Sequence, residues 1–168
     1  MILKFIFCES IKIHKYKKEM IKLITKEGVT FEVDENVANK FVTVKNLIDD
    51  IGAADPIPLP EIDELTLKKI LEFTQYHMDV PVTVENDEFI LSDWDKQFFK
   101  IEMPLLLSVV TSSNYLDYKE LLDMSVQTVA NLITDKSPEE IRAIFGIVSD
   151  FTPEEEEAIR KENEWLEE

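Results

Sequence analysis

Residues 137–168 read SPEEIRAIFGIVSDFTPEEEEAIRKENEWLEE, and this stretch contains one helix-start pattern twice. Ser137 and Thr152 can each cap the free N–H groups of a first helical turn, and the proline after each of them suits the first helical position. A glutamate three residues after each cap, Glu140 or Glu155, completes a capping box. The pattern predicts two terminal helices, and neither has enough apolar side chains for a core of its own.

Two short β-favouring runs lie near the other end of the chain, in IKLITKEGVTFEV at residues 21–33. They flank a turn whose Gly28 permits a tight reversal of the backbone, so the segment predicts a hairpin. After Val33 the pattern turns helical and ends at Gly52. The prolines within residues 55–60 exclude a helix there and predict an edge strand or an extended connector.

The middle of the chain combines helical periodicity with one polar interruption. A 3.6-residue apolar stripe predicts a helix over about residues 63–77. The polar segment 81–88 predicts a surface loop. After it, Ser92 and Asp95 have capping-box spacing at the start of a short helix.

Two longer helices are predicted beyond this point. Pro104 suits a first helical turn, and residues 105–110 are apolar nearly all round, which predicts a central, buried helix. The next helix is indicated by apolar residues at i, i+4, i+7 and i+11, namely Leu122, Val126, Val129 and Ile133. Since strands come early and helices dominate afterwards, the predicted fold class is α+β, a small sheet packed with helices.

The charge of the chain excludes several classes of function. Its 168 residues, enough for one domain with a small appendage, include 35 acidic and 18 basic residues, a net charge of −17. Residues 27–168 alone carry −22, because the first 26 residues hold seven of the lysines. Such a surface repels nucleic acid, whose binding needs cationic side chains. No apolar run approaches the roughly 18 residues of a membrane span, so we expect no membrane partner.

Cysteine usage and the first residues of the chain bear on its location. Cys8 is the only cysteine, so no intramolecular disulfide requires an oxidising compartment. The opening MILKFIFCES lacks the small-residue cleavage site of a signal peptide. We therefore expect a cytoplasmic and nuclear location.

Catalytic and cofactor-binding patterns are missing from the sequence. The three glycines are scattered, whereas phosphate-binding loops need them clustered. His14, His77 and Cys8 are isolated rather than spaced as metal ligands, and His77 at a helix end is expected at the surface. We expect no enzyme activity, no cofactor and no metal. A small acidic hydrolase that uses a carboxylate pair remains an alternative, because acidic residues are plentiful.

Residues 21–168 resemble the Skp1 family, the adaptor subunits of SCF (Skp1–cullin–F-box) ubiquitin ligases. The resemblance is carried by IKLITKEGVTFEV, VTVKNLIDDIG, PIPLP, WDKQFFKI, NYLDYKELLD and TVANLI, and is densest in the two terminal helices. It implies a BTB/POZ domain at residues 20–134 and a helical extension at 135–168 that binds F-box proteins. Residues 1–19 have no counterpart in the family and are expected to be a flexible extension.

The resemblance also implies two binding surfaces and no catalytic centre. One surface would hold a cullin, and through it a RING protein and an E2, at Asn114 and Tyr115. The other would hold an F-box protein, at Leu107, Val110, Val126, Val129, Phe145, Ile147, Arg160, Asn163, Trp165 and Leu166. Leu107 and Val126 keep only the apolar character of the family residues, and Leu166 replaces a common cysteine. A homodimer of the free chain stays open.

A scaffold that binds F-box proteins in cullin-free assemblies, such as kinetochore or vacuolar-ATPase regulatory complexes, is a second alternative. It would use the same F-box surface, so the residues do not separate it from a ligase adaptor. The identities of the F-box partners, the substrates and the source lineage are not specified by the sequence.

Overall fold

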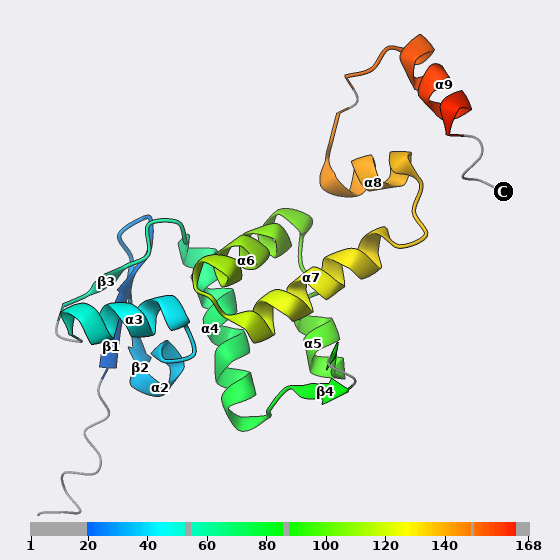
Figure 1. The fold of residues 1–168 in the computed structure, drawn as a ribbon. Helices are drawn as coiled ribbons and strands as arrows, with labels where there is room; N and C mark the ends of the chain where they lie inside the picture. The colour runs from blue at the N-terminus through cyan, green and yellow to red at the C-terminus, as the bar shows by residue number, and fades with distance from the viewer. Residues whose placement is uncertain (1–19, 53–54, 86–87, 149, 164–168) are drawn as a thin grey trace, which may run out of the picture. The chain divides into compact units, whose positions relative to one another are not determined.

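A computed structural model describes residues 20–52, 55–85, 88–148 and 150–163 of the chain (Figure 1). The chain forms two compact units, which divide between Asn131 and Leu132. The sequence predicted a boundary between a BTB/POZ domain and a helical extension after residue 134. Because the two units are defined by compactness alone, that assignment of domains stays a prediction. Each unit is described by itself below.

Unit 1 begins with a three-stranded sheet. Strands β1 (Met20–Ile24) and β2 (Thr30–Asp34) are antiparallel, and β3 (Ile57–Pro58) pairs with β1 in parallel, so the order is β2-β1-β3. Gly28 in the β1–β2 turn has φ +83°, a left-handed conformation that glycine adopts without strain. The predicted hairpin is therefore confirmed, and the proline-rich segment is an edge strand.

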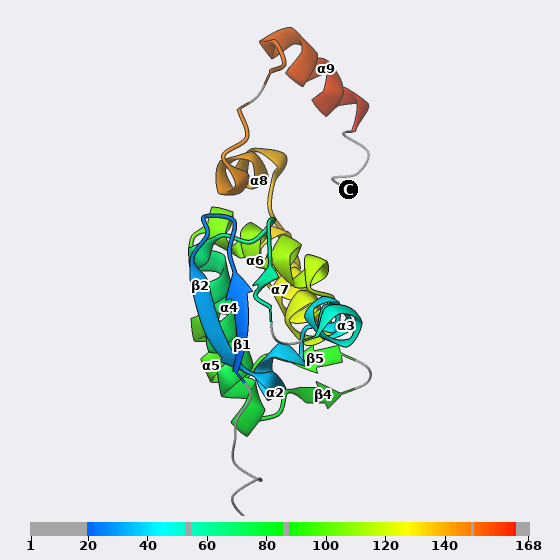
Figure 2. The same cartoon turned by 90° about the vertical axis from the view of Figure 1, so that its left-hand side faces the viewer.

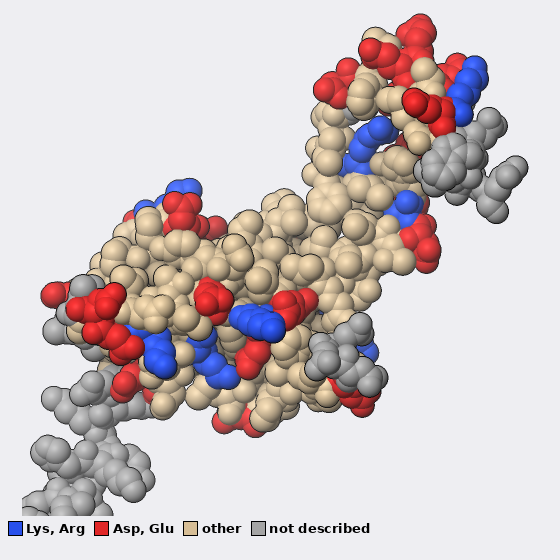
Figure 3. Space-filling view, in the orientation of Figure 1, with Lys and Arg blue, Asp and Glu red and all other residues tan. Residues whose placement is uncertain are grey.

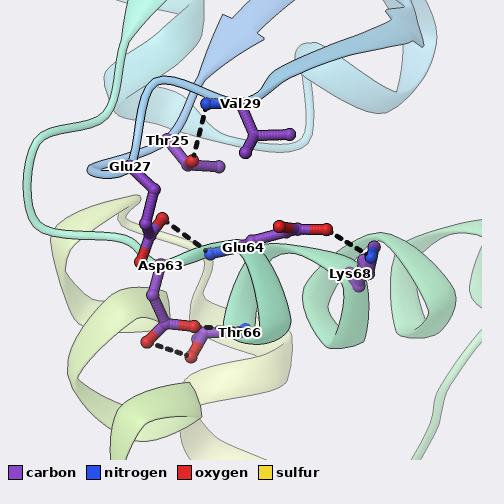
Figure 4. Close-up of polar contacts among 7 residues, drawn as sticks. All are labelled: Thr25, Glu27, Val29, Asp63, Glu64, Thr66 and Lys68. Carbon is purple, nitrogen blue, oxygen red and sulfur yellow. Dashed lines mark hydrogen bonds and ion pairs between the residues drawn. The ribbon is translucent and has the colours of Figure 1, made fainter.

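The turn of this hairpin is tied to the start of helix α4 (Glu64–Asp79) (Figure 4). The Glu27 carboxylate accepts a hydrogen bond from the Glu64 N–H at 3.1 Å. Asp63 caps the same helix, since its carboxylate accepts from the Thr66 N–H at 2.8 Å. Free N–H groups of the first turn are thus satisfied from two parts of the chain, which sets the hairpin against α4.

Helices make up most of the rest of unit 1. Helix α4 lies next to the sheet (Figures 1 and 2), and α6 packs against α4. The remaining elements of unit 1 are α2 (Glu35–Ala38), α3 (Val42–Ile51), β4 (Thr83–Glu85), β5 (Glu88–Ile90), α5 (Asp93–Phe98), α6 (Met103–Tyr115) and α7 (Lys119–Ile133), the last of which ends just beyond the division. Phe73 of α4 lies centrally in the core, with its ring centroid 5.4 Å from that of Phe98 and 6.0 Å from that of Tyr118.

Two predictions for the middle of the chain are wrong. Segment 81–88 is not simply a surface loop, because β4 and β5 form an antiparallel hairpin in which Val84 pairs with Phe89. Its strands have three residues each, too few for an alternating pattern to be recognised. His77 is not a surface residue either. It is 7% exposed, because its ring contacts Phe73 and hydrogen-bonds to Asp95.

The helices α6 and α7 occur where they were predicted, but their buried faces differ from the expectation. Helix α6 buries Leu106 and Val109 and leaves Leu107 exposed, so it is not buried all round. Helix α7 buries Leu121 and Met124 most deeply, whereas in the apolar stripe used to predict it Val126 is exposed and Val129 is only partly buried against the core. A stripe shows that a helix is amphipathic and leaves open what covers its apolar side.

Unit 2 contains α8 (Pro138–Phe145) and α9 (Pro153–Glu162). Both predicted starts are confirmed. Ser137 accepts from the Glu140 N–H at 3.2 Å while the Glu140 carboxylate accepts from the Ser137 N–H at 2.9 Å. Thr152 and Glu155 form the same reciprocal pair at 3.3 and 2.8 Å.

Candidate protein-binding surfaces

Helices α6 and α7 each turn apolar side chains to solvent. Leu107 on α6 is 37% exposed and Val126 on α7 is 48% exposed. Val110 and Val129, one turn further along each helix, are half-buried. All four residues predicted for the F-box surface in unit 1 are therefore accessible at least in part.

The same feature is stronger in unit 2. Helix α8 has no buried residue, and its Phe145 is half-buried. Ile147, which follows the helix, is 58% exposed. The prediction from sequence missed Val148, which is 88% exposed, and Phe151. Apolar residues between two capped helices were the signal that could have found them.

Four predicted residues at the end of the chain gain less support, namely Arg160, Asn163, Trp165 and Leu166. Asn163 is exposed, and its side-chain amide donates to the Ile159 carbonyl of its own helix at 2.9 Å. Trp165 and Leu166 lie outside the described residues, as does the side chain of Arg160. Their assignment to the F-box surface stays a prediction.

The two residues predicted to contact a cullin lie at the end of α6, where the chain turns toward α7. Asn114 is exposed and Tyr115 is half-buried. The reversal follows at Asp117, whose φ is +51°, and the Asp117 N–H donates to the Asn114 carbonyl at 3.1 Å. We call residues 114–118 the α6–α7 corner.

Acidic side chains are concentrated on helix α9. Helix α9 has Glu154, Glu155 and Glu156 in its first turn, and Figure 3 shows mostly acidic side chains over this helix. The backbone N–H of Thr152 stabilises the Glu155 carboxylate and lowers its pKa from 4.5, and Ser137 acts in the same way on Glu140. At the corner, burial raises the pKa of the Tyr118 phenol above its ordinary value of 10, and the Glu120 carboxylate raises it further.

The exposed apolar side chains favour a protein-binding role. No group of three metal-ligating side chains occurs in the part of the chain that the structure describes. None of the helices within the described ranges is both long and apolar enough to cross a bilayer. Exposed apolar side chains on helices, beside charged ones, are typical of a surface that another protein covers. The fold and the surfaces thus define an α+β protein-binding module.

Comparison with known proteins identifies the family of this module. Residues 19–79 match the Skp1 family tetramerisation domain, and residues 119–166 match the Skp1 family dimerisation domain. The chain is 46% identical over 155 residues to the SCF ubiquitin ligase complex protein SKP1a of Dictyostelium discoideum, an alignment that covers 88% of this chain and 96% of that relative. The chain therefore belongs to the Skp1 family.

Two fungal relatives support the same assignment. The E3 ubiquitin ligase complex SCF subunit sconC of Arthroderma benhamiae is 40% identical over 88% of this chain and 95% of its own length. The suppressor of kinetochore protein 1 of Schizosaccharomyces pombe is 44% identical over 88% of this chain and 97% of its own length. The likeness thus extends over nearly the whole of each relative.

Proposed function

We propose that this protein is a non-catalytic adaptor subunit of an SCF E3 ubiquitin ligase, which bridges F-box substrate receptors to a cullin. The names of two of its relatives state membership in an SCF complex. The F-box protein would bring the substrate, and the cullin would bring a RING protein and the E2. The adaptor itself has only to hold both partners in place.

The observation that supports this proposal best is that helices α6, α7 and α8 leave apolar side chains uncovered. Helix α8 buries none of its residues, and α6 and α7 leave Leu107 and Val126 exposed. An F-box is a small helical unit, so its apolar side chains would cover these faces and gain roughly 25 cal/mol per Å² of buried apolar area. Trp165, which lies outside the described residues, is proposed for the same surface because interfacial tryptophans are frequent hot spots.

The experiment that tests the F-box surface compares two exposed valines. Val126→Asp places a charge on the proposed surface, whereas Val84→Asp does so on β4, where Val84 is 51% exposed. We expect Val126→Asp to weaken the binding of a purified F-box protein by at least about tenfold, since a buried unpaired charge is costly. Val84→Asp should bind as the wild type does. Equal affinity of the two variants would reject the assigned surface.

The second candidate function is a scaffold that binds F-box proteins in assemblies without a cullin. It is favoured by the fission yeast relative, whose name refers to the kinetochore. This role would use the F-box surface and leave the α6–α7 corner without a partner. Purification of the endogenous complex, followed by mass spectrometry, separates the two candidates. Recovery of F-box proteins together with a cullin supports the ligase adaptor, and recovery of F-box proteins alone supports the scaffold.

A hydrolase with a carboxylate pair has less support. The general acid of such a pair needs a raised pKa. The capping bonds of Glu140 and Glu155 lower theirs instead. A purified protein that hydrolyses ester or glycosidic model substrates would revive this alternative.

We also propose that the protein is located in both the cytoplasm and the nucleus. Fluorescence microscopy of the tagged full chain tests this placement. A signal confined to a membrane-bound organelle other than the nucleus would contradict it.

A further inference from the structure

The end of helix α6 and the start of helix α3 satisfy each other's free backbone groups. The Thr43 N–H, in the first turn of α3, donates to the Leu116 carbonyl at 3.2 Å. The Thr43 hydroxyl donates to the Tyr115 carbonyl at 2.8 Å. The first N–H groups and the last carbonyl groups of a helix have no partner within that helix. Thr43 therefore pairs a free N–H group of α3 and also supplies a donor to a free carbonyl of α6.

Two further contacts join the same segments. The Lys40 ammonium lies 3.4 Å from the Glu120 carboxylate, with both side chains about one-third exposed. The rings of Phe41 and Tyr118 meet edge to face, with centroids 5.6 Å apart. Residues 40–43, which we call the brace, thus contact the chain on both sides of Asp117.

The α6–α7 corner reverses the chain through a left-handed residue that follows the helix end. Asp117 has a left-handed φ of +51°, which costs energy for a residue with a Cβ. Within the corner, the Tyr118 N–H donates to the Ser113 carbonyl at 2.9 Å. These local bonds shape the turn, and the brace adds bonds to the carbonyls of Tyr115 and Leu116 from another part of the chain.

We infer that Thr43 is a positioning residue for cullin binding, which holds the last turn of α6 so that Asn114 and Tyr115 are presented in one conformation. This inference rests on the proposed function. Without the hydroxyl, the Tyr115 carbonyl would lose its partner and the corner would sample other conformations. A partner that binds one conformation loses affinity in proportion to the population that is lost.

The test replaces the hydroxyl without changing the branched shape of the side chain. We expect Thr43→Val to weaken the binding of a purified cullin N-terminal region by about fivefold, the effect of losing one hydrogen bond of ordinary strength. Thr43→Ser keeps the hydroxyl and should bind within about twofold of the wild type. Thr128→Val is the matched control, because the Thr128 hydroxyl bonds the Met124 carbonyl of its own helix, and it should leave cullin affinity unchanged.

Two more measurements distinguish positioning from general damage. Binding of an F-box protein should stay at the wild-type value in Thr43→Val, and the urea midpoint should fall by no more than the loss of this one hydrogen bond accounts for, while amide exchange at residues 114–118 becomes faster. Wild-type cullin affinity in Thr43→Val, or a parallel loss of cullin binding, F-box binding and stability, would overturn the inference. If the wild-type chain itself does not bind cullin, the proposed function fails instead.

Discussion

The imidazole of His77 and the carboxylate of Asp95 form a buried hydrogen-bonded pair, with Nε2 and Oδ1 2.9 Å apart and both side chains at most 4% exposed. The other ring nitrogen, Nδ1, lies 2.8 Å from the Val80 carbonyl oxygen, so both ring nitrogens are held by oxygen atoms. The second oxygen of Asp95 accepts from the Ser92 N–H at 2.8 Å and completes the α5 capping box. The pair therefore joins the end of α4 to the start of α5.

We predict that Asp95→Ala destabilises the protein by about 3 kcal/mol, because it leaves a buried imidazole without a partner and removes a helix cap. Asp93→Ala is the matched control. The Asp93 carboxylate is fully exposed and 3.5 Å from the Lys96 ammonium, and surface pairs of this kind add little to stability. Urea unfolding followed by circular dichroism measures both. Equal midpoints for the two variants would contradict the structural role of the pair.

His77 shows where prediction from sequence stopped. The sequence allowed the capping box of Ser92 and Asp95 to be predicted, because its residues lie within one turn. It did not reveal that Asp95 also meets a histidine 18 positions earlier, since only the packing of α4 against α5 brings the two together. The position of a histidine at the end of a helix therefore does not predict whether its side chain is buried.

In the binding surfaces, too, local features were predictable from the sequence and features that depend on tertiary packing were not. Helix starts at Ser137 and Thr152 were predictable, because caps are local. The stripe that contains Val126 predicted a helix but not its buried face, because exposure depends on what lies opposite in the fold. Asn114 and Tyr115 came from family resemblance alone. The hydrogen bonds from Thr43, 72 residues away from Tyr115, required the three-dimensional structure.

Charge at the α6–α7 corner provides a test of the cullin surface. Asn114 is exposed, so Asn114→Lys should fold normally yet weaken cullin binding by about tenfold or more if the partner covers this position. The Tyr115 ring packs against the core, so Tyr115→Lys is the more damaging change. Calorimetry with a cullin fragment and with an F-box protein measures both surfaces. Loss of F-box affinity in Asn114→Lys would indicate misfolding rather than a lost contact.

The start of α9 should be sensitive to acid. Because capping bonds lower the folded-state pKa of Glu155, the cap stabilises the helix above the unfolded value of 4.5 and is lost as the pH falls through the lower folded value. Glu155→Gln keeps an acceptor at the capping position and has no charge to titrate. The chemical shift of the Thr152 amide, followed by NMR from neutral to acidic pH, should show this transition in the wild type. A transition that persists in Glu155→Gln would assign it to another group.

The ring of Tyr118 is well packed, but the desolvation of its buried hydroxyl lowers the stability of the folded protein. The residue is 2% exposed, and its hydroxyl makes no hydrogen bond of standard geometry within the described ranges. Tyr118→Phe keeps the ring contacts with Phe41 and Phe73 and removes a desolvated polar group, so we expect stability to stay equal or to rise by up to about 1 kcal/mol. Tyr118→Ala loses the ring as well and should cost about 3 kcal/mol or more.

The pH dependence of these variants gives a second, independent readout. Burial raises the folded-state pKa of the Tyr118 phenol, so the unfolded chain releases this proton first and wild-type stability falls as the pH rises above 10. Tyr118→Phe cannot ionise and should lose less stability over that range. Urea unfolding at neutral pH and at about pH 10.5 measures the difference. A phenylalanine variant that is less stable at neutral pH would show that the hydroxyl has a stabilising partner in solution.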